Sequence, residues 1–312
     1  VIPLKVIARR HIRYKYACRS CEGVASEDEG GAVKIAKPPV KLLPKTIASN
    51  STLAYLAVSK FCDHLPFYRQ QKIFKRLDID IPRQTMCRWM MMIAEKVNPV
   101  IKLMKREIRS GHFMGIDETP VQVLREPGRD PTSKSYMWVF RGGRPDNPIL
   151  LYEYRETRAG KFLPEYLQGF KGYIQTDGFS GYNSLLPQDS IKQAACWAHV
   201  RRKFYEAVKE KKKTGTAHWF FNKIERLYLI ERNARQNNLA PEEIKQLRLE
   251  KAKPILDQIK ERLDNKAQTI IADSTTGKAI NYTLKIWNKL ITYLDDGIIP
   301  IDNNLVENAI RP

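Results

Sequence analysis

The chain lacks the two features that would place a protein in or across a membrane. None of its apolar runs approaches the roughly 20 residues that a spanning helix needs, and no signal peptide is recognisable at its start. Cysteines are few: there are five, an odd number scattered over 312 residues, which excludes the disulfide framework of a small secreted protein. We therefore expect reduced thiols and a soluble protein of the cytoplasm.

Negative charge is also scarce, because 34 acidic residues stand against 54 Lys and Arg, for a formal net charge of +20 and a pI near 9.7. Such an excess suits a polyanion, since each neutralised phosphate releases condensed counterions and steers association. Nucleic acid is therefore the first candidate partner. With 43% hydrophobic residues the chain can bury a large core, and its length predicts two or more structural units.

Two short segments place an acid at the end of an apolar run. Residues 112–117 end in Asp117, and because Pro120 follows, we expect a strand that stops here with Asp117 at its C-terminal end. Residues 172–177 repeat this design, and Gly178 would let the backbone turn sharply after Asp177. The pattern therefore predicts two carboxylates at the mouths of neighbouring strands.

A third acid, Glu307, lies in a segment with helical periodicity. Asn303 and Arg311 recur at four-residue intervals with Glu307 on a polar face, and Asp302 or Asn303 is expected to cap the N-terminus. The opposite face is predicted to be an apolar stripe of Leu305, Val306, Ala309 and Ile310. Glu307 would then point outward.

Three acids at one site raise one another's pKa unless cations neutralise them. Magnesium prefers oxygen ligands, and two such ions ~4 Å apart can activate an attacking water and stabilise a leaving oxygen. Taken singly, each acid is more often a turn residue or a solvated helix position. Taken together, the three predict a centre that cuts phosphodiester bonds.

Four segments, GIDETP, QTDGFSGYN, CWAHVRRKF and DNNLVENAIRP, occur in this order and resemble the insertion-sequence-66 family of bacterial transposases. The resemblance runs through nearly the whole chain. It implies a ribonuclease-H-like core with a DDE triad of Asp117, Asp177 and Glu307, which would hold two magnesium or manganese ions. It also implies double-stranded DNA as partner, at transposon ends and in the target, a homo-oligomer, and a location at the nucleoid.

The same resemblance gives Cys196 and His199 an auxiliary role, because they match a Cys-x-x-His signature that such transposases carry after the second acid. His199 could hydrogen-bond a catalytic carboxylate or a phosphate, and Arg201 or Arg202 could hold the DNA backbone. The alternative is a histidine packed beside Trp197 with arginines that simply face solvent.

At the N-terminal end, Cys18 and Cys21 form a Cys-x-x-Cys pair, which is half of a tetrahedral zinc site. In the resembled family a zinc-ribbon-like segment precedes the catalytic region, so the other cysteine pair would precede Val1. Because the chain opens without methionine, we expect an excerpt of a longer protein. Two free thiols in a turn are the alternative, and His11 is a possible further ligand.

Residues 51–61, 66–76 and 83–97 are predicted helices, and the last two suggest a helix-turn-helix. Arg83, Gln84 and Arg88 open its second helix, where a major-groove reader places base or phosphate contacts. The alternative is a helical scaffold, since a basic helix face is usually just solvated.

The predicted fold class is α/β (α+β), with a five-stranded mixed sheet interrupted by an all-helical insertion in which Pro254 would kink a helix. The predicted parts are a zinc-ribbon-like remnant with exposed strands and a linker (1–44), a helical region (45–110), the first part of the core (111–205), the insertion (206–299) and a catalytic helix (300–312). The predicted activity is metal-dependent cleavage at transposon ends followed by strand transfer. A structure-specific nuclease of the same fold and a non-catalytic DNA-binding protein of a decayed element are the alternatives.

Overall fold

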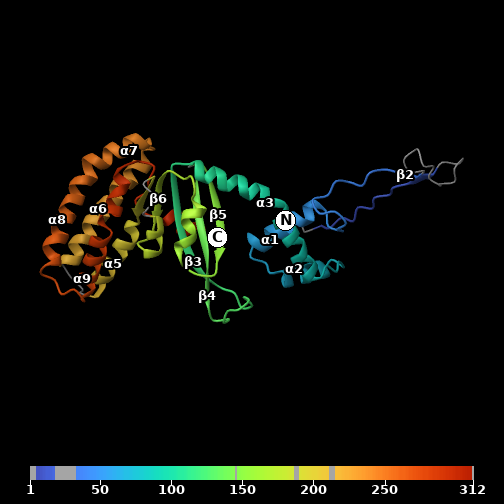
Figure 1. Ribbon diagram of the computed structural model, residues 1–312, viewed down its shortest axis with the longest axis horizontal. Coiled ribbons are helices and arrows are strands. Elements are labelled where there is room, and N and C mark those ends of the chain that lie inside the picture. The colour runs from blue at the N-terminus through green and yellow to red at the C-terminus, as the bar shows by residue number, and fades with distance from the viewer. Residues whose placement is uncertain (1–4, 18–32, 145, 186–189, 211–214, 311–312) are drawn as a thin grey trace. The chain divides into compact units, whose positions relative to one another are not determined.

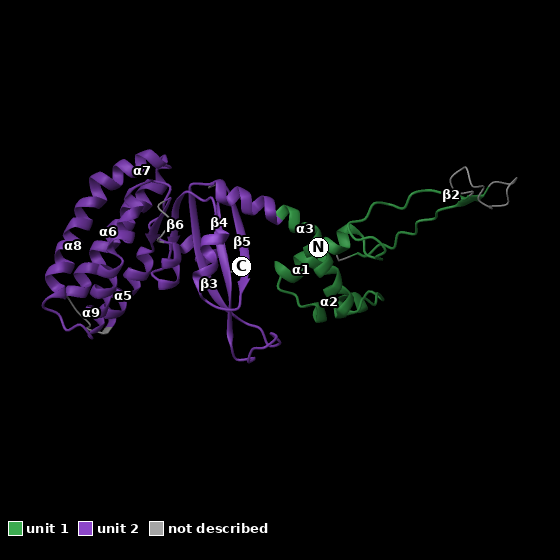
Figure 2. Ribbon diagram, viewed as in Figure 1, with its two compact units in different colours: residues 1–100 green, residues 101–312 purple. Residues whose placement is uncertain are grey.

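The computed structural model describes residues 5–17, 33–144, 146–185, 190–210 and 215–310. Contacts divide the chain into two units, residues 1–100 and 101–312, which Figure 2 shows in green and purple. Cys18 and Cys21 lie outside the described residues, so zinc binding there stays a prediction. Among the described helices, none combines the length and the apolar character that crossing a membrane requires.

In unit 1, strands β1 (Lys15–Ala17) and β2 (Val33–Ile35) form a small antiparallel ribbon with exposed side chains. Residues 33–35 lie within segment 1–44, where we expected a partly extended linker at this point, and they form a paired strand instead. Two β-branched residues flank Lys34, which favours a strand. Pairing with β1 also satisfies backbone groups that a linker would leave to water.

Three helices follow: α1 (Asn50–Phe61), α2 (Phe67–Lys75) and α3 (Arg83–Ser110). The residue that caps α1 is Ser49, whose hydroxyl oxygen accepts the Thr52 N–H (3.2 Å). The cap thus lies two residues before the predicted start of this helix at residue 51. The helices of unit 1 enclose a small core made of Leu43, Leu53, Leu56, Phe74, Met86 and Trp89.

Helix α3 continues to Ser110, well beyond the end that we predicted at Val97. It passes through Pro99, which lacks the N–H that would bond back along the helix. Residues 95–100 are exposed, so water can satisfy the backbone carbonyl that Pro99 leaves free.

Unit 2 contains a five-stranded mixed sheet made of β3 (Phe113–Gln122), β4 (Lys134–Arg144), β5 (Asn147–Arg155), β6 (Gly172–Thr176) and β7 (Ile191–Ala195). The strand order is β5-β4-β3-β6-β7 (Figure 1). Strands β3, β6 and β7 are parallel, whereas β4 runs antiparallel to β3 and to β5. This arrangement is that of a ribonuclease-H-like core and confirms the predicted fold class.

Strand β3 does not stop at Asp117, as we expected, but continues through Pro120 to Gln122. The reason is that β3 pairs with β6 only as far as Gly115, while its ladder with β4 extends to Gln122. Beyond Gly115 one edge of β3 is unpaired, and an edge strand tolerates a proline. Asp117 therefore lies in the middle of a strand, at the point where the sheet narrows.

Alternation along β3 separates two faces of the sheet. Met114 and Ile116 point into a core that also holds Trp138, Phe140 and Ile174. This core is closed by the C-terminal part of α3 and by the short helical segments η1 (Gly160–Phe162), α4 (Leu163–Tyr166) and η2 (Ser180–Leu185). Gly115 and Asp117 consequently belong to the opposite face.

A helical region follows β7 and lies beside β6 and β7 in Figure 1. It consists of α5 (Trp197–Glu210), α6 (Thr216–Gln236), α7 (Pro241–Leu247), the π-helix η3 (Arg248–Ala252), α8 (Lys253–Ala267), α9 (Thr275–Lys285), α10 (Trp287–Ile291) and η4 (Thr292–Leu294). A π-helix, η3, ends just before Pro254, which lies in the first turn of α8; the kink expected at Pro254 stays a prediction. The last helix, α11 (Asn304–Ile310), returns to the sheet.

A buried ion pair fixes the segment that leads to α11. The Arg248 guanidinium donates from Nε and Nη2 to the Glu231 carboxylate (both 2.8 Å), and it also donates to the carbonyl oxygens of Tyr293, Asp296 and Ile299. Its remaining N–H groups thus hold the backbone of residues 293–299, just before the turn that precedes α11.

Candidate active site

Parallel pairing of β3 and β6 places two acids at one level of the sheet. Asp177 follows directly after β6, as predicted, and Gly115 pairs with Gln175. Extending this register by two residues puts Asp117 opposite Asp177. The two carboxylates therefore come from neighbouring strands at the edge where β6 ends.

Helix α11 lies across the same face of β3. A Cβ atom built on Gly115 would lie 2.4 Å from Cγ2 of Val306, so only glycine leaves room for the helix at this point. Val306 is buried, and Glu307 follows it as a half-buried residue. Close docking of α11 therefore brings the third acid to the face that carries Asp117.

Three details of the predicted helix are wrong, the first being that Glu307, expected to point outward, has a buried carboxylate oxygen. Leu305, assigned to the apolar stripe, is 51% exposed, whereas Asn303, assigned to the solvated polar face, is 1% exposed. The helix is short and touches β3 mainly through Val306, so it buries a narrower stripe than the periodicity suggested. Arg311 lies outside the described residues.

Asn303 is buried because it joins three parts of the site. Its side-chain Nδ2 donates to the carbonyl oxygen of Ile116 (3.0 Å), and its backbone N–H donates to Sγ of Cys196 (3.3 Å). Its own carbonyl oxygen accepts the N–H groups of Val306 and Glu307, which starts α11. The sequence did not indicate this role, because a helix-cap pattern says nothing about a neighbouring strand.

Asp302 stabilises the N-terminus of α11, as expected for one of the two predicted capping residues. Its Oδ1 accepts the N–H of Asn304 (3.2 Å), and its Oδ2 accepts from the side-chain amide of the same residue (2.9 Å). This carboxylate is therefore engaged with the backbone and side chain of its neighbour.

The acids interact electrostatically. Burial, followed by the charges of Glu118, Asp177 and Glu307, raises the pKa of Asp117 to about 7, against a hydrogen bond from the Glu118 N–H that lowers it. A carboxyl group in such a position is easily protonated in the absence of a counter-charge. A cation placed beside these carboxylates would lower that pKa.

A second acid on β3, Glu118, was not singled out in the sequence. Its side chain is fully buried, accepts hydrogen bonds from the hydroxyl of Tyr182 and from Arg158, and faces away from Asp117 along the strand. Burial raises the pKa of Glu118, and the charge of Asp177 adds to that effect, while Tyr182 and Arg158 oppose it.

Arg158 is the cation of this network. Its Nη2 lies 2.6 Å from Oε1 of Glu118 and 3.6 Å from Oδ2 of Asp177, and its guanidinium stacks on the ring of Phe179 (3.8 Å). The side chain is 41% exposed. Arg158 sits in a loop after β5 and its partners lie on other elements, which is why no local sequence pattern identified it.

The backbone bends at Gly178, as predicted, but this bend is not what requires glycine there. Its φ lies outside the left-handed region, so no special turn conformation requires glycine. Instead, a Cβ atom at this position would lie 2.5 Å from the hydroxyl oxygen of Tyr282 on α9. Close approach of the helical region to the second acid is what excludes a side chain.

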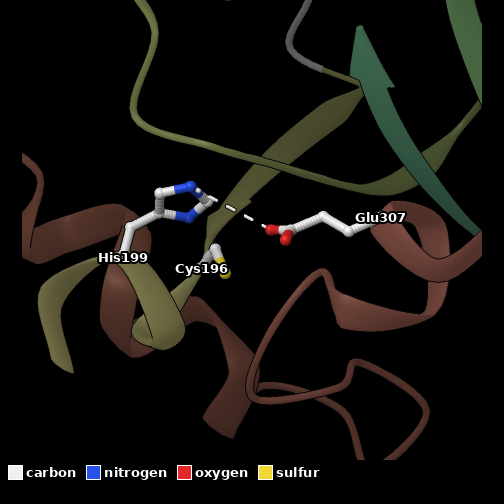
Figure 3. A group of neighbouring side chains, drawn as sticks. All are labelled: Cys196, His199 and Glu307. Atoms are coloured by element: carbon white, nitrogen blue, oxygen red, sulfur yellow. Dashed lines mark ion pairs between the residues drawn. The ribbon is translucent and has the colours of Figure 1, made fainter. Parts of the chain in front are cut away.

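Cys196, His199 and Glu307 gather at the junction of β7, α5 and α11 (Figure 3). Nε2 of His199 lies 4.0 Å from Oε1 of Glu307. His199 Nδ1 and Glu307 Oε1 are buried and have no hydrogen-bond partner among the described residues. Burial raises the pKa of the Cys196 thiol to about 12, which makes it a poor nucleophile.

The alternative for this segment placed a packed histidine beside Trp197. Trp197 is fully buried and its indole N–H donates to the carbonyl oxygen of Leu290 (3.0 Å), but His199 remains partly exposed and turns toward Glu307.

The two arginines after His199 differ in their surroundings. Arg201 forms an ion pair with Glu225 on α6 and lies over the rings of Phe221 and Tyr228, so it holds α5 against α6. Arg202 is exposed and has no ion pair within the part of the chain that the structure describes. Of the two, Arg202 is the one available to a phosphate.

The residues proposed to contact DNA in unit 1 lie where the sequence predicted. Arg83, Gln84 and Arg88 occupy the first two turns of α3 and are all exposed. Their role in DNA binding stays a prediction.

The structure thus combines a ribonuclease-H-like sheet with acids on β3, after β6 and on a returning helix. The chain belongs to the transposase IS66 family, whose family model matches residues 45–312.

Three curated relatives from Sinorhizobium fredii (strain NBRC 101917 / NGR234) are similar over essentially the whole chain. The uncharacterized protein y4qI is 32% identical over 100% of this chain and 58% of its own length. The uncharacterized protein y4jD is 32% identical over 100% of this chain and 61% of its own length, and y4hP is 26% identical over 99% and 57%. The chain therefore spans about three-fifths of the length of these relatives.

Proposed function

We propose that unit 2 cleaves phosphodiester bonds at transposon ends and joins the resulting 3′-hydroxyl to target DNA, using divalent cations held by Asp117, Asp177 and Glu307. The observation that carries the proposal is the register of β3 and β6, which puts two carboxylates at one level, on the face of β3 across which α11 lies. Membership of a transposase family supports the choice of DNA as substrate.

The residues present fit magnesium or manganese. Three carboxylates supply oxygen donors only, which is the ligand chemistry that hard divalent cations prefer. The buried Oε1 of Glu307 has no hydrogen-bond partner within the described residues, and burial beside other acids raises the pKa of Asp117, an effect that a bound cation would oppose. When bound, two such ions would supply an activated water and a stabilised leaving oxygen.

The chain's own groups would orient the substrate. Arg158, held by buried Glu118 and partly exposed beside Asp177, can donate to a phosphate oxygen. Exposed Arg202 on α5 can hold the DNA backbone, and Arg83 and Arg88 on α3 would add contacts in unit 1. The net charge of +20 favours this partner. Assembly as a homo-oligomer on paired ends is part of the same proposal.

The test is incubation of the full-length protein with its element's ends and magnesium, with products resolved by strand. Cleavage with a free 3′-hydroxyl and joined products is expected. Cleavage without joining would favour a structure-specific nuclease, and binding without cleavage a non-catalytic DNA-binding protein.

The matched control is Asp177→Asn, which is nearly isosteric but lacks the charge that holds a cation. It should keep the fold and DNA affinity and reduce cleavage more than a hundredfold. Cleavage near the parent rate with magnesium or manganese would show that Asp177 is not a ligand.

A further inference from the structure

Cys196, His199 and Glu307 present one sulfur, one ring nitrogen and one carboxylate oxygen that all lie within 4.8 Å of one another (Figure 3). Cys196 comes from the end of β7 and His199 from the first turn of α5, with the two-residue spacing at which paired ligands reach one ion. Glu307 approaches from α11.

This donor set differs in kind from the all-oxygen set that suits magnesium. Thiolate and imidazole are ligands of zinc and of similar transition metals. With zinc–ligand bonds of roughly 2.0–2.3 Å in a tetrahedron, the ligand atoms stand roughly 3.3–3.8 Å apart. The observed separations, none above 4.8 Å, exceed this by about 1.5 Å at most, a gap that rotation of the His199 and Glu307 side chains can close.

A second observation points to a ligand at the same place. His199 Nδ1 and Glu307 Oε1 are both buried without a hydrogen-bond partner in the described part of the chain, although buried polar groups are normally satisfied. In addition, the Asn303 N–H donates to Sγ of Cys196 (3.3 Å), a hydrogen bond of the kind that orients a sulfur ligand toward a metal. Three protein ligands would leave a fourth position open, as in exchangeable rather than structural zinc sites.

We propose that Cys196, His199 and Glu307 form a site for one zinc-class ion, and that the ion withdraws Glu307 from Asp117 and Asp177. The binding site stands on the geometry alone, whereas its inhibitory effect rests on the proposed function. Glu307 would thus be a ligand in two alternative metal sites, one with Asp117 and Asp177 and the other with Cys196 and His199. The available metal ion would decide which of the two sites forms.

The binding test uses cobalt(II), which replaces zinc and gives a sulfur-to-cobalt charge-transfer absorption. The titration is done on the full chain carrying Cys18→Ser and Cys21→Ser, so that the Cys-x-x-Cys pair near the N-terminus cannot bind the metal. Titration should give the band at one equivalent per chain. The band should disappear in Cys196→Ser and persist in Cys62→Ser, because Cys62 is exposed and far along the sequence from the cluster.

Since Cys196 is buried, its replacement could disturb folding, and circular dichroism checks this. His199→Gln, at a partly exposed position, provides the second variant and should weaken cobalt binding at least tenfold while keeping the fold. No charge-transfer band in the parent chain, a band that survives Cys196→Ser, or unchanged affinity in His199→Gln would each overturn the site.

The inhibitory effect is tested on the same Cys18→Ser/Cys21→Ser chain without further substitution. One equivalent of zinc should reduce magnesium-dependent cleavage at least tenfold, and a chelator should restore it. Full cleavage with the site saturated would overturn the inhibition. If cleavage is absent even without zinc, the proposed function fails and the inhibition fails with it. The metal site is tested separately by cobalt titration of Asp177→Asn, the variant expected to lack cleavage. A charge-transfer band in that variant would show that the site binds metal independently of cleavage.

Discussion

At the scale of single residues, the acids near the site differ in what their carboxylates contact. Asp302 and Glu307 lie five residues apart at the start of α11, and either has the side chain to act as third acid. Their surroundings differ, since Asp302 accepts the backbone N–H of Asn304, whereas Glu307 has a buried carboxylate oxygen without a partner in the described residues and raises the pKa of Asp117.

We therefore expect Glu307→Gln to abolish cleavage, by more than a hundredfold, with little loss of stability. Asp302→Asn should leave cleavage within a few-fold of the parent, because asparagine also caps helices well. Single-turnover cleavage and thermal unfolding measure the two effects. An inactive Asp302→Asn beside an active Glu307→Gln would overturn the triad.

Arg158 and Arg155 provide a matched pair. Both are about two-fifths exposed, both stack on a phenylalanine ring and both pair with a glutamate, but only Arg158 also approaches Asp177 (3.6 Å). Arg158→Ala should reduce cleavage at least tenfold at saturating DNA, since it removes a cation beside the second acid and leaves buried Glu118 with Tyr182 but without its cationic partner. Arg155→Ala should reduce it less than threefold. Equal effects would mean that Arg158 acts only through folding.

At the scale of elements, the position of α11 depends on the absence of a side chain in β3. Gly115→Ala would place a methyl group 2.4 Å from Val306, and the helix would have to move. We expect a loss of cleavage of at least tenfold together with a lower melting temperature. Gly111→Ala is the control, because its nearest neighbour, at 3.5 Å, is an ordinary contact. Full activity of Gly115→Ala would show that α11 docks more loosely than described.

The buried pair of Arg248 and Glu231 makes a second prediction at this scale. Arg248→Met would leave the Glu231 carboxylate and three backbone carbonyl groups unsatisfied, so we expect a loss of about 3–5 kcal/mol in unfolding free energy. Lys253→Met, which removes a surface pair with Asp257, should cost less than about 1 kcal/mol. Urea denaturation compares the two, and a similar cost for both would contradict the structural role of Arg248.

Elements were easier to predict from the sequence than the contacts between them. The order and type of the strands follow from apolar runs and turn residues, as does the placement of Asp177 after β6. The extension of β3 past Pro120 depends on where its neighbour β6 ends, and the end of α3 depends on the exposure of Pro99, so local patterns could not give either. Arg158 and Asn303 act across elements separated by tens of residues, a relationship that only the folded chain defines.

At the scale of the whole molecule, the exposed α3 residues proposed to bind DNA lie in a different unit from the acids proposed to cut it. Arg83 and Arg88 lie in the unit formed by residues 1–100, whereas Asp117, Asp177 and Glu307 lie in the unit formed by residues 101–312. Binding and chemistry should therefore be separable by mutation. Changes in the first unit should alter DNA affinity while leaving the rate at saturating DNA unchanged, and changes to the acids should do the reverse.

The final prediction uses the salt dependence of this binding. A chain of charge +20 should contact several phosphates, and the logarithm of affinity should fall by about 0.9 per contact for each logarithmic unit of salt. Arg83→Ala and Arg88→Ala should each lower affinity for duplex DNA and reduce that slope by about one, because each removes one phosphate contact. Arg69→Ala, an exposed arginine on α2 of the same unit, should change the slope by much less. Fluorescence anisotropy over a series of salt concentrations gives the slopes, and unchanged slopes in both α3 variants would make α3 a scaffold rather than a DNA-binding helix.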